Sequence, residues 1–196
     1  MTAPWLPGEL ALASGRRVRP FALAAADLDP FGAGADLGDV LARTLSKLPR
    51  FGGHHAGPAW SVAQHCVVMA AVVPGGVPEI RWALAHELFE GLTGLDVPAP
   101  LKAGWAAYRA AERRALRLFA ETWGPAVEGP LGWPIPDRIA EADRRMAATE
   151  ARVLGVPCDL GARPYDLGAD DARPWPRDRA ESEFAGAWRT LFTVRA

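Results

Sequence analysis

The amino-acid sequence predicts an all-α fold built as one domain. Apolar residues recur at helical spacing in successive segments, Pro and Gly residues bound these segments, and no stretch favours sheet over helix. A chain of 196 residues, 49% of them hydrophobic, is long enough to bury a substantial core. We therefore expect residues 1–196 to form a single helical bundle with a short irregular or hairpin N-terminus.

The segment before the first helix is expected to be irregular apart from a short hairpin in residues 10–23. A helix is then predicted over residues 36–48, because its apolar residues share one face and Pro49 ends it. These apolar residues are Leu37, Val40, Leu41, Leu45 and Leu48. Residues 50–60, "RFGGHHAGPAW", are predicted to be a loop that carries two histidines.

The second helix is predicted to start at Ser61, which has capping-box spacing to Gln64. In such a box the Ser side chain bonds the backbone three residues on, and the Gln side chain reaches back. The apolar positions of this helix are Val62, Cys66, Met69 and Val73, and Pro74 ends it. A third helix is predicted over residues 78–90, with Pro in its first turn.

Three further helices are predicted in the second half of the chain. They cover residues 101–123, residues 136–155 with Gly155 as the C-cap, and residues 179–192. Residues 157–176 are rich in Pro, Gly and Asp and are predicted to form an ordered surface loop.

Composition excludes several classes of function. The net charge of −1 gives no electrostatic reason to expect binding to nucleic acid or to a membrane surface. Two cysteines do not make a disulfide framework, and the N-terminus lacks the pattern of a signal peptide, so a cytoplasmic protein is expected. The longest strongly apolar run, "CVVMAAVV", is too short to span a bilayer.

The polar residues of three predicted helices form a candidate metal site. His86 and Glu90 are four residues apart on one helical face, with Glu87 about 100° around the helix. His65 lies at the apolar stripe of the second helix, and Asp143 lies in the helix predicted over 136–155. Two imidazoles and two carboxylates suit one divalent ion of borderline hardness.

Each of these residues also has an ordinary alternative, because a lone His is more often a core residue and a helical carboxylate usually faces solvent. The stretch "HELFE" begins like the zinc-protease motif H-E-x-x-H, but Glu90 stands where that motif needs its second His. The protease reading therefore fails, and spacing alone leaves a metal site and an ordinary helix both open.

The order of four stretches resembles a known family. "LPRFGGH", "SVAQHCVVMA", "ALAHELFEGLTGLDVPAPLK" and "EADRRMAATEAR" span about residues 37–155 and are similar to the HD-domain phosphohydrolases. The resemblance is greatest to the small bacterial and phage branch, which includes 5′-deoxynucleotidases and dATP triphosphohydrolases. It implies a helical core that holds a divalent metal, for which Mn, Co, Zn and Mg are the candidates.

The resemblance assigns roles to individual residues. The metal ligands would be His65, the adjacent pair His86 and Glu87, and the later Asp143. The catalytic carboxylate of the deoxynucleotidases matches Glu90.

A second catalytic acid and the substrate contacts come from the flanking motifs. The Asp before the family's P-x-P-L-K tail matches Asp96, and Arg50 with Phe51 matches an Arg–aromatic pair that contacts substrate. We add further candidates for substrate binding: His54 and Lys102 as phosphate clamps, and Trp60 as a stacking surface.

Two departures from the family pattern stand out. The pair that names the family is His-Asp, whereas Glu87 is one methylene longer and reaches about 1.5 Å further. In addition, Leu95 stands between Gly94 and Asp96, which makes that loop one residue longer and re-aims Asp96.

The expected function is a metal-dependent phosphohydrolase that removes the 5′-phosphate of deoxynucleotide monophosphates. Monophosphates are favoured because the motif region offers few cationic residues. The alternatives left open are a dNTP triphosphohydrolase, an inactive nucleotide-binding homologue, and a purely structural α-domain. The expected partners are a nucleotide and, by analogy with the family, further copies of the chain. From the net charge, no nucleic-acid polymer and no membrane is expected.

Overall fold

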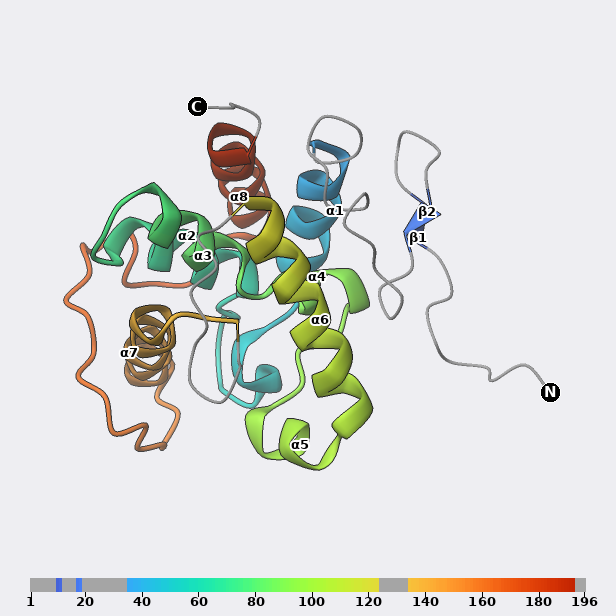
Figure 1. Cartoon of the computed structure of the whole chain (residues 1–196). Coiled ribbons are helices and arrows are strands. Elements are labelled where there is room, and N and C mark those ends of the chain that lie inside the picture. Colours follow the sequence, from blue (N-terminus) through green and yellow to red (C-terminus); the bar gives the residue numbers. More distant parts are fainter. Residues whose placement is uncertain (1–9, 12–16, 19–34, 124–133, 193–196) are drawn as a thin grey trace.

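The chain is all-α, as the sequence predicts. The computed structural model describes residues 10–11, 17–18, 35–123 and 134–192 (Figure 1). Its helical elements are α1 (Ala35–Leu45), η4 (Arg50–Gly53), α2 (Val62–Val72), α3 (Val77–Ala85), α4 (Leu88–Thr93), α5 (Ala99–Gly104), α6 (Ala106–Trp123), α7 (Asp137–Leu154) and α8 (Arg177–Phe192).

Two short strands precede the helices. β1 (Leu10–Ala11) pairs antiparallel with β2 (Arg17–Val18), so that Leu10 lies opposite Val18. This pairing is the one expected of the predicted hairpin, whereas residues 12–16 and 19–34 lie outside the described part of the chain. Figure 1 shows the strand pair on the outer side of α1.

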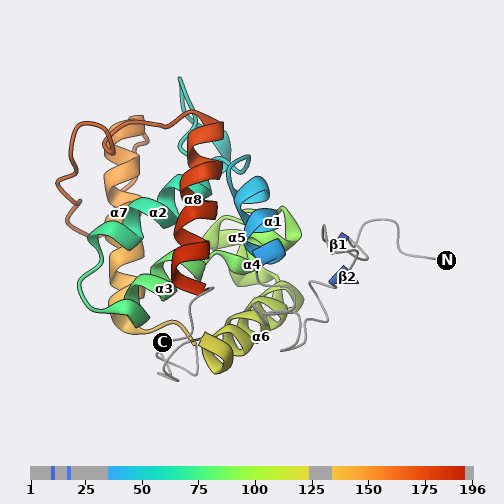
Figure 2. The same ribbon diagram turned by 90° about the horizontal axis from the view of Figure 1, so that it is seen from above.

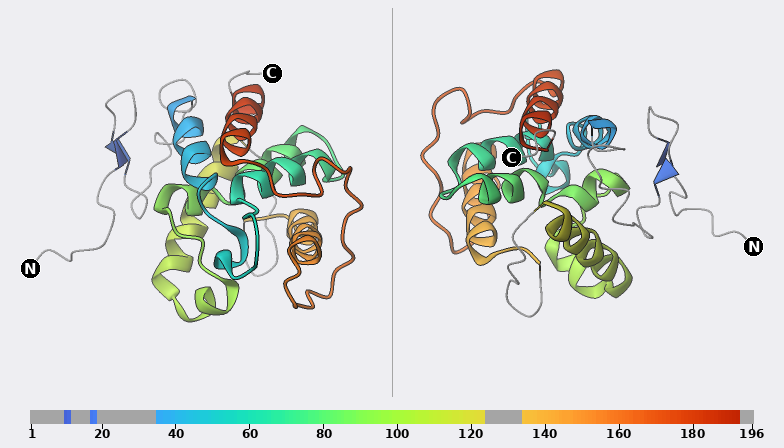
Figure 3. Two further views of the ribbon diagram at one scale, coloured as in Figure 1. Left: turned by 180° about the vertical axis from the view of Figure 1, so that it is seen from behind. Right: turned by 45° about the horizontal axis from the view of Figure 1, so that its top comes forward.

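The helices stack so that α2 and α3 lie in the middle of the molecule. α8 packs against α1, α2 and α3 on one side, and α7 packs against α2 and α3 on the other (Figures 2 and 3). α4 contacts α1 and α6, and α5 also packs on α6. The middle layer therefore has neighbours on both sides, which buries most of α2 and the second half of α3, from Trp82 to Ala85.

A continuous apolar core fills the space between these layers. Its largest fully buried side chains include Trp60, Trp82, Phe89, Phe119 and Phe184. The rings of Trp82 and Phe119 meet edge to face with centroids 5.0 Å apart, which joins α3 to α6. Burial of aromatic side chains of this size is the main stabilising contribution to such a domain.

Two glycines allow α1 to approach its neighbours closely. A Cβ atom at Gly38 would lie 2.2 Å from Cδ1 of Trp188 in α8. A Cβ atom at Gly91 in α4 would lie 2.5 Å from Cδ2 of Leu41 in α1. Both contacts are shorter than any allowed carbon–carbon distance, so only glycine fits at these crossings.

The helix predicted over residues 78–90 is in fact two helices. α3 ends at Ala85, and α4 begins only at Leu88 after Glu87 adopts φ −96° and ψ 20°. Nδ1 of His86 donates to the carbonyl of Ala83 at 2.8 Å, the carbonyl that a continuous helix would use for the N–H of Glu87. The prediction that His86 and Glu90 share one uninterrupted helix is therefore wrong.

The other boundaries agree more closely with prediction. The helix predicted over 101–123 is divided at Trp105 into α5 and α6. Gly155 ends α7 in the left-handed region at φ 65°, as expected of a C-cap glycine. None of the helices in the described ranges is both long and apolar enough to cross a membrane.

The predicted Ser61 cap of α2 is present, but the Gln64 side chain does not bond back to the start of the helix. Oγ of Ser61 accepts from the backbone N–H of Gln64 at 3.1 Å. The Gln64 side chain turns instead to the loop before α8, where it donates to the carbonyl of Arg173 and accepts from the N–H of Trp175. This buried amide therefore fastens the predicted surface loop to α2.

Candidate metal centre and active site

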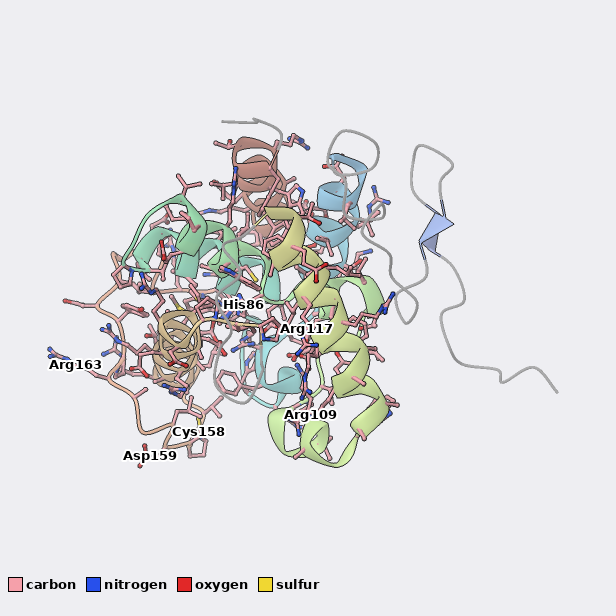
Figure 4. All side chains as sticks on the ribbon, in the orientation of Figure 1. His86, Arg109, Arg117, Cys158, Asp159 and Arg163 are labelled. Atoms are coloured by element: carbon pink, nitrogen blue, oxygen red, sulfur yellow. The ribbon has the colours of Figure 1, made fainter. Side chains whose placement is uncertain are left out.

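Four predicted ligands converge from separate elements of the fold. His65 lies in α2, His86 and Glu87 lie at the junction of α3 and α4, and Asp143 lies in α7. The first three are buried, whereas the side chain of Asp143 is 39% exposed. Figure 4 shows His86 near the middle of the molecule, between α7 and α6. The α3–α4 break thus places two ligands where three helices meet.

The ligand atoms lie within ion-sharing distance of one another. Nε2 of His65 is 3.1 Å from Nε2 of His86 and 3.3 Å from Oδ1 of Asp143. Nε2 of His86 is 3.9 Å from the same Asp143 oxygen and 3.8 Å from Oε1 of Glu87. In the described part of the chain, His65, His86 and Glu87 are the group that geometry identifies as able to hold an ion.

These distances and donor types fit a divalent cation. Two ligand atoms at about 2.1 Å from one ion are about 3 Å apart at right angles and about 4 Å apart when opposed. All four measured separations fall in that interval. Oδ1 of Asp143 is buried without a hydrogen-bond partner, and such an atom is costly unless a cation or water satisfies it.

Both imidazoles present Nε2 to the site because their Nδ1 atoms are engaged elsewhere. Nδ1 of His86 donates to Ala83, and Nδ1 of His65 lies 2.6 Å from Oε1 of Glu150. Burial lowers the pKa of His86, which favours the neutral ring. Burial and Arg50 also act to lower the pKa of His65, but Glu150 and Asp143 outweigh them and raise it to about 9.

Arg50 lies against the candidate ligands. Its Nη1 is 3.2 Å from Glu87, its Nη2 is 3.7 Å from Asp143, and its Nε is 2.9 Å from Glu150. Burial would lower the pKa of Arg50, but these three carboxylates hold it well above its usual value. The guanidinium is therefore a fixed positive charge beside the site.

A tight turn presents Arg50 at this place. The N–H of Arg50 donates to the carbonyl of Trp60 at 2.8 Å, and an isolated bridge joins Pro49 to Ser61. Phe51 follows with φ 55°, a left-handed conformation that is uncommon for a non-glycine residue. Strain of this kind is found where surrounding contacts impose a conformation.

The same charges act on the carboxylates. Burial would raise the pKa of Glu87, but His86, Lys102 and Arg50 outweigh it and lower that pKa to about 2. Burial also acts against ionisation of Asp143, yet His65, His86 and Arg50 leave its pKa below the usual value. Both groups are thus held in the ionised form that binds metal.

Sequence reasoning did not identify Glu150. This residue has no exposed surface, and it touches both His65 and Arg50. Its position held a usable signal, because Glu150 lies seven residues after Asp143 in α7 and so falls on the same face two turns later. A carboxylate on the ligand-bearing face of an amphipathic helix is a candidate partner for a buried cation or imidazole.

A second charged cluster surrounds Glu90. Nζ of Lys102 binds Oε1 of Glu90 and Oε1 of Glu112, the latter at 2.8 Å, and Tyr108 lies 3.5 Å from Glu90. Burial and the charges of Glu87 and Glu112 raise the pKa of Glu90 well above its usual value, against the effect of Lys102. Lys102, predicted to clamp phosphate, is thus already paired with two carboxylates.

A cavity of about 410 Å³ opens onto the candidate ligands. Its walls are His86, Glu87, Asp143, Lys102, Ala103, Arg109, Glu112, Ile135, Ile139 and Ala140. Glu90 has no exposed surface and is not part of this wall, so its link to the cavity runs through Lys102. The cavity has an apolar side from α7 and a charged side from the ligands and α6.

Asp96 lies in the loop between α4 and α5. Gly94 adopts φ 70° at the end of α4, and the exposed Leu95 accepts a hydrogen bond from Tyr108 through its carbonyl. Burial and Glu87 raise the pKa of Asp96, whereas Arg50 and Lys102 lower it. The charged groups of the site therefore change the pKa of Asp96. Its catalytic role stays a prediction.

The remaining predicted substrate contacts lie differently. Trp60 is fully buried in the core, which leaves it no surface on which a base or sugar could stack. Phe51 is half-buried next to Arg50, and His54 is exposed on the loop that follows. The described interactions do not connect His54 to the ligand cluster.

Comparison of the chain with protein-family models and with curated proteins finds no match to either. The resemblance to HD-domain phosphohydrolases therefore stays a prediction that depends on the motifs and on the geometry around them.

Proposed function

We propose that this protein is a metal-dependent phosphohydrolase that cleaves the 5′-phosphate ester of deoxynucleotide monophosphates. The observation that supports it best is the meeting of four potential ligands with Arg50 beside them. His65 is buried behind the cavity, and the other three, His86, Glu87 and Asp143, line its wall. Imidazole and carboxylate ligands suit a divalent ion, and the ligand atoms of His65, His86 and Glu87 all lie within 4.8 Å of one another.

The reaction joins a water oxygen to phosphorus and releases the 5′ oxygen of the nucleoside with a proton. A divalent cation held by the four ligands would neutralise phosphate charge and acidify that water. The guanidinium of Arg50 suits a second role, because its planar fork binds phosphate oxygens in pairs. Its contacts with Glu87 and Asp143 hold the guanidinium beside the place where a phosphate would bind this site.

Glu90 and Lys102 are the proposed proton-transfer pair. The buried Glu90 has a raised pKa, which is the property expected of a group that exchanges protons near neutral pH. Lys102 contacts Glu90 and also lines the cavity, so it connects the buried carboxylate to the bound substrate. Asp96 is the proposed second acid, which positions the water or protonates the leaving oxygen.

The proposal is tested by adding Mn, Co, Zn or Mg separately to the purified chain and supplying a panel of dNMPs and dNTPs. Products are identified as phosphate or triphosphate. Release of phosphate from dNMPs that needs metal and is lost in Asp143→Asn is the expected result. Bound metal without turnover of any nucleotide would instead favour an inactive nucleotide-binding protein.

A dNTP triphosphohydrolase is the second candidate, and one observation favours it. Arg109 of α6 lines the same cavity as the candidate ligands, and it adds a cation that the motifs alone do not supply (Figure 4). Triphosphate as the product in the same assay would select this activity. Arg109→Ala should then raise KM for dNTPs while leaving any dNMP turnover unchanged.

Self-association is also proposed, by analogy with the family alone. Light scattering coupled to gel filtration measures it directly, and a mass of one chain at all concentrations would contradict it.

A further inference from the structure

We infer that Glu150 is a positioning residue that sets both the metal-ligand nitrogen of His65 and the guanidinium of Arg50. This inference rests on the proposed metal site. The sequence motifs assign Glu150 no role as a metal ligand or as a catalytic residue. Its proposed role follows from its contacts alone.

One carboxylate divides its two oxygens between the two partners. Oε1 lies 2.6 Å from Nδ1 of His65, and Oε2 accepts from Nε of Arg50 at 2.9 Å. Glu150 and His65 have no exposed surface at all. The two short contacts to one fully buried group fix the orientations of both partners relative to α7.

The contact with His65 determines which nitrogen can bind metal. An Nδ1–H that donates to Glu150 leaves the lone pair on Nε2, the atom that faces His86 and Asp143. A carboxylate behind a ligating imidazole also increases the basicity of the ring. Loss of such a partner weakens metal binding by roughly 10- to 100-fold.

The contact with Arg50 aims the other end of the guanidinium. Because Glu150 holds Nε, the two terminal nitrogens are directed to Glu87 and Asp143, beside the cavity. Glu150 therefore links the metal ligand of α2 to the proposed phosphate-binding residue of η4. A change at this one position should disturb metal affinity and substrate KM together.

A purely structural role makes a different prediction. If Glu150 only neutralised the buried charge of Arg50, any negative group at this position would suffice. Glu150→Asp keeps the charge but shortens the side chain by one methylene, so it cannot reach both partners. The positioning role therefore predicts a defect in Glu150→Asp, whereas charge neutralisation alone predicts none.

The experiment titrates Co²⁺ into the full chain by calorimetry and follows the visible absorption of the bound ion. Glu150→Gln and Glu150→Asp are compared with Glu141→Gln, a control from the exposed side of the same helix. The expected result is Co²⁺ affinity lower by roughly 10- to 100-fold and an altered spectrum in both Glu150 variants, with the control unchanged.

Circular dichroism and the melting temperature of the metal-free variants establish that they fold. Co²⁺ affinity and spectrum equal to wild type in folded Glu150→Asp would overturn the inference. Failure of the proposed function is separate, because it would show as metal-bound wild type that releases no phosphate. Wild type that binds no Co²⁺ would overturn the inference and the metal-dependent function alike.

Discussion

The molecule contains two charged clusters, and each of them has more carboxylates than cations. The two clusters differ in how this excess negative charge can be balanced. The ligand cluster holds the carboxylates of Glu87, Asp143 and Glu150 around one cation, Arg50. The second cluster holds Glu90 and Glu112 around Lys102. Metal binding requires both imidazoles to be neutral, so His65 must first lose the proton that Glu150 and Asp143 favour. In that form the first cluster has three negative charges against one positive, a surplus of two, and the second cluster has a surplus of one.

The difference lies in how each surplus can be removed. Glu90 has a raised pKa, so a single proton on that carboxyl neutralises the second cluster. In the ligand cluster, Glu87 and Asp143 have lowered pKa values and stay ionised. A divalent cation would carry the charge that balances this surplus. Both clusters reach the same cavity, through Glu87 and Asp143 in the first and through Lys102 and Glu112 in the second.

The largest effect on metal affinity is expected from removing a ligand charge. Asp143→Asn keeps the size of the side chain but removes one negative charge and one anionic ligand oxygen. Metal affinity measured by calorimetry should fall by more than roughly 100-fold, since even loss of an outer partner costs 10- to 100-fold. The rise in melting temperature on adding metal should disappear with it. Unchanged affinity in this variant would remove Asp143 from the site.

A change in the second cluster should affect kcat without affecting metal affinity, unlike a change in the ligand cluster. Glu90→Gln leaves the four proposed ligands intact and removes the proposed proton-transfer group. Metal affinity should stay within about twofold of wild type, while kcat for phosphate release falls by roughly 100- to 10,000-fold, the usual worth of such a group. Lost metal binding would instead make Glu90 a ligand and join the two clusters into one.

Lys102 gives a test of stability rather than rate. Lys102→Met preserves much of the packing of the side chain but leaves Glu90 and Glu112 without their shared cation. Breaking one partner of a buried pair costs about 3 kcal/mol, which urea unfolding can measure. Protonation of Glu90 would relieve part of this cost, so the loss should be smaller at acidic pH. Lys47→Met, at an exposed position, is the matched control.

The same comparison shows what could be predicted from sequence. Periodicity, Pro and Gly positions predicted the helices and the ends of α7, because those signals act within a few residues. The break after Ala85 was missed, since it depends on a side-chain hydrogen bond from His86 to a backbone carbonyl. That bond competes with the helix only once the ring is held in the core.

Residue types and the order of the motifs were enough to predict the candidate ligands of the site. Glu150 was missed because its role depends on α2 and η4 lying against α7, and sequence spacing does not report such packing. Trp60 is a stacking candidate by sequence, whereas the fold places its side chain in the core. Both positions depend on contacts between segments that are far apart in the sequence.

The smallest effect is expected at the position that departs from the family pattern. Glu87→Asp restores the His-Asp pair that the motifs resemble, but it withdraws the carboxylate by about 1.5 Å from Arg50 and from the other ligands. Glu87 lies in the α3–α4 break at φ −96° and ψ 20°, and its side chain is buried. Metal affinity by calorimetry should therefore fall by about tenfold, since a misplacement of about 1 Å is costly in a preorganised site. Equal or tighter binding in Glu87→Asp would show that the longer side chain is tolerated here rather than required.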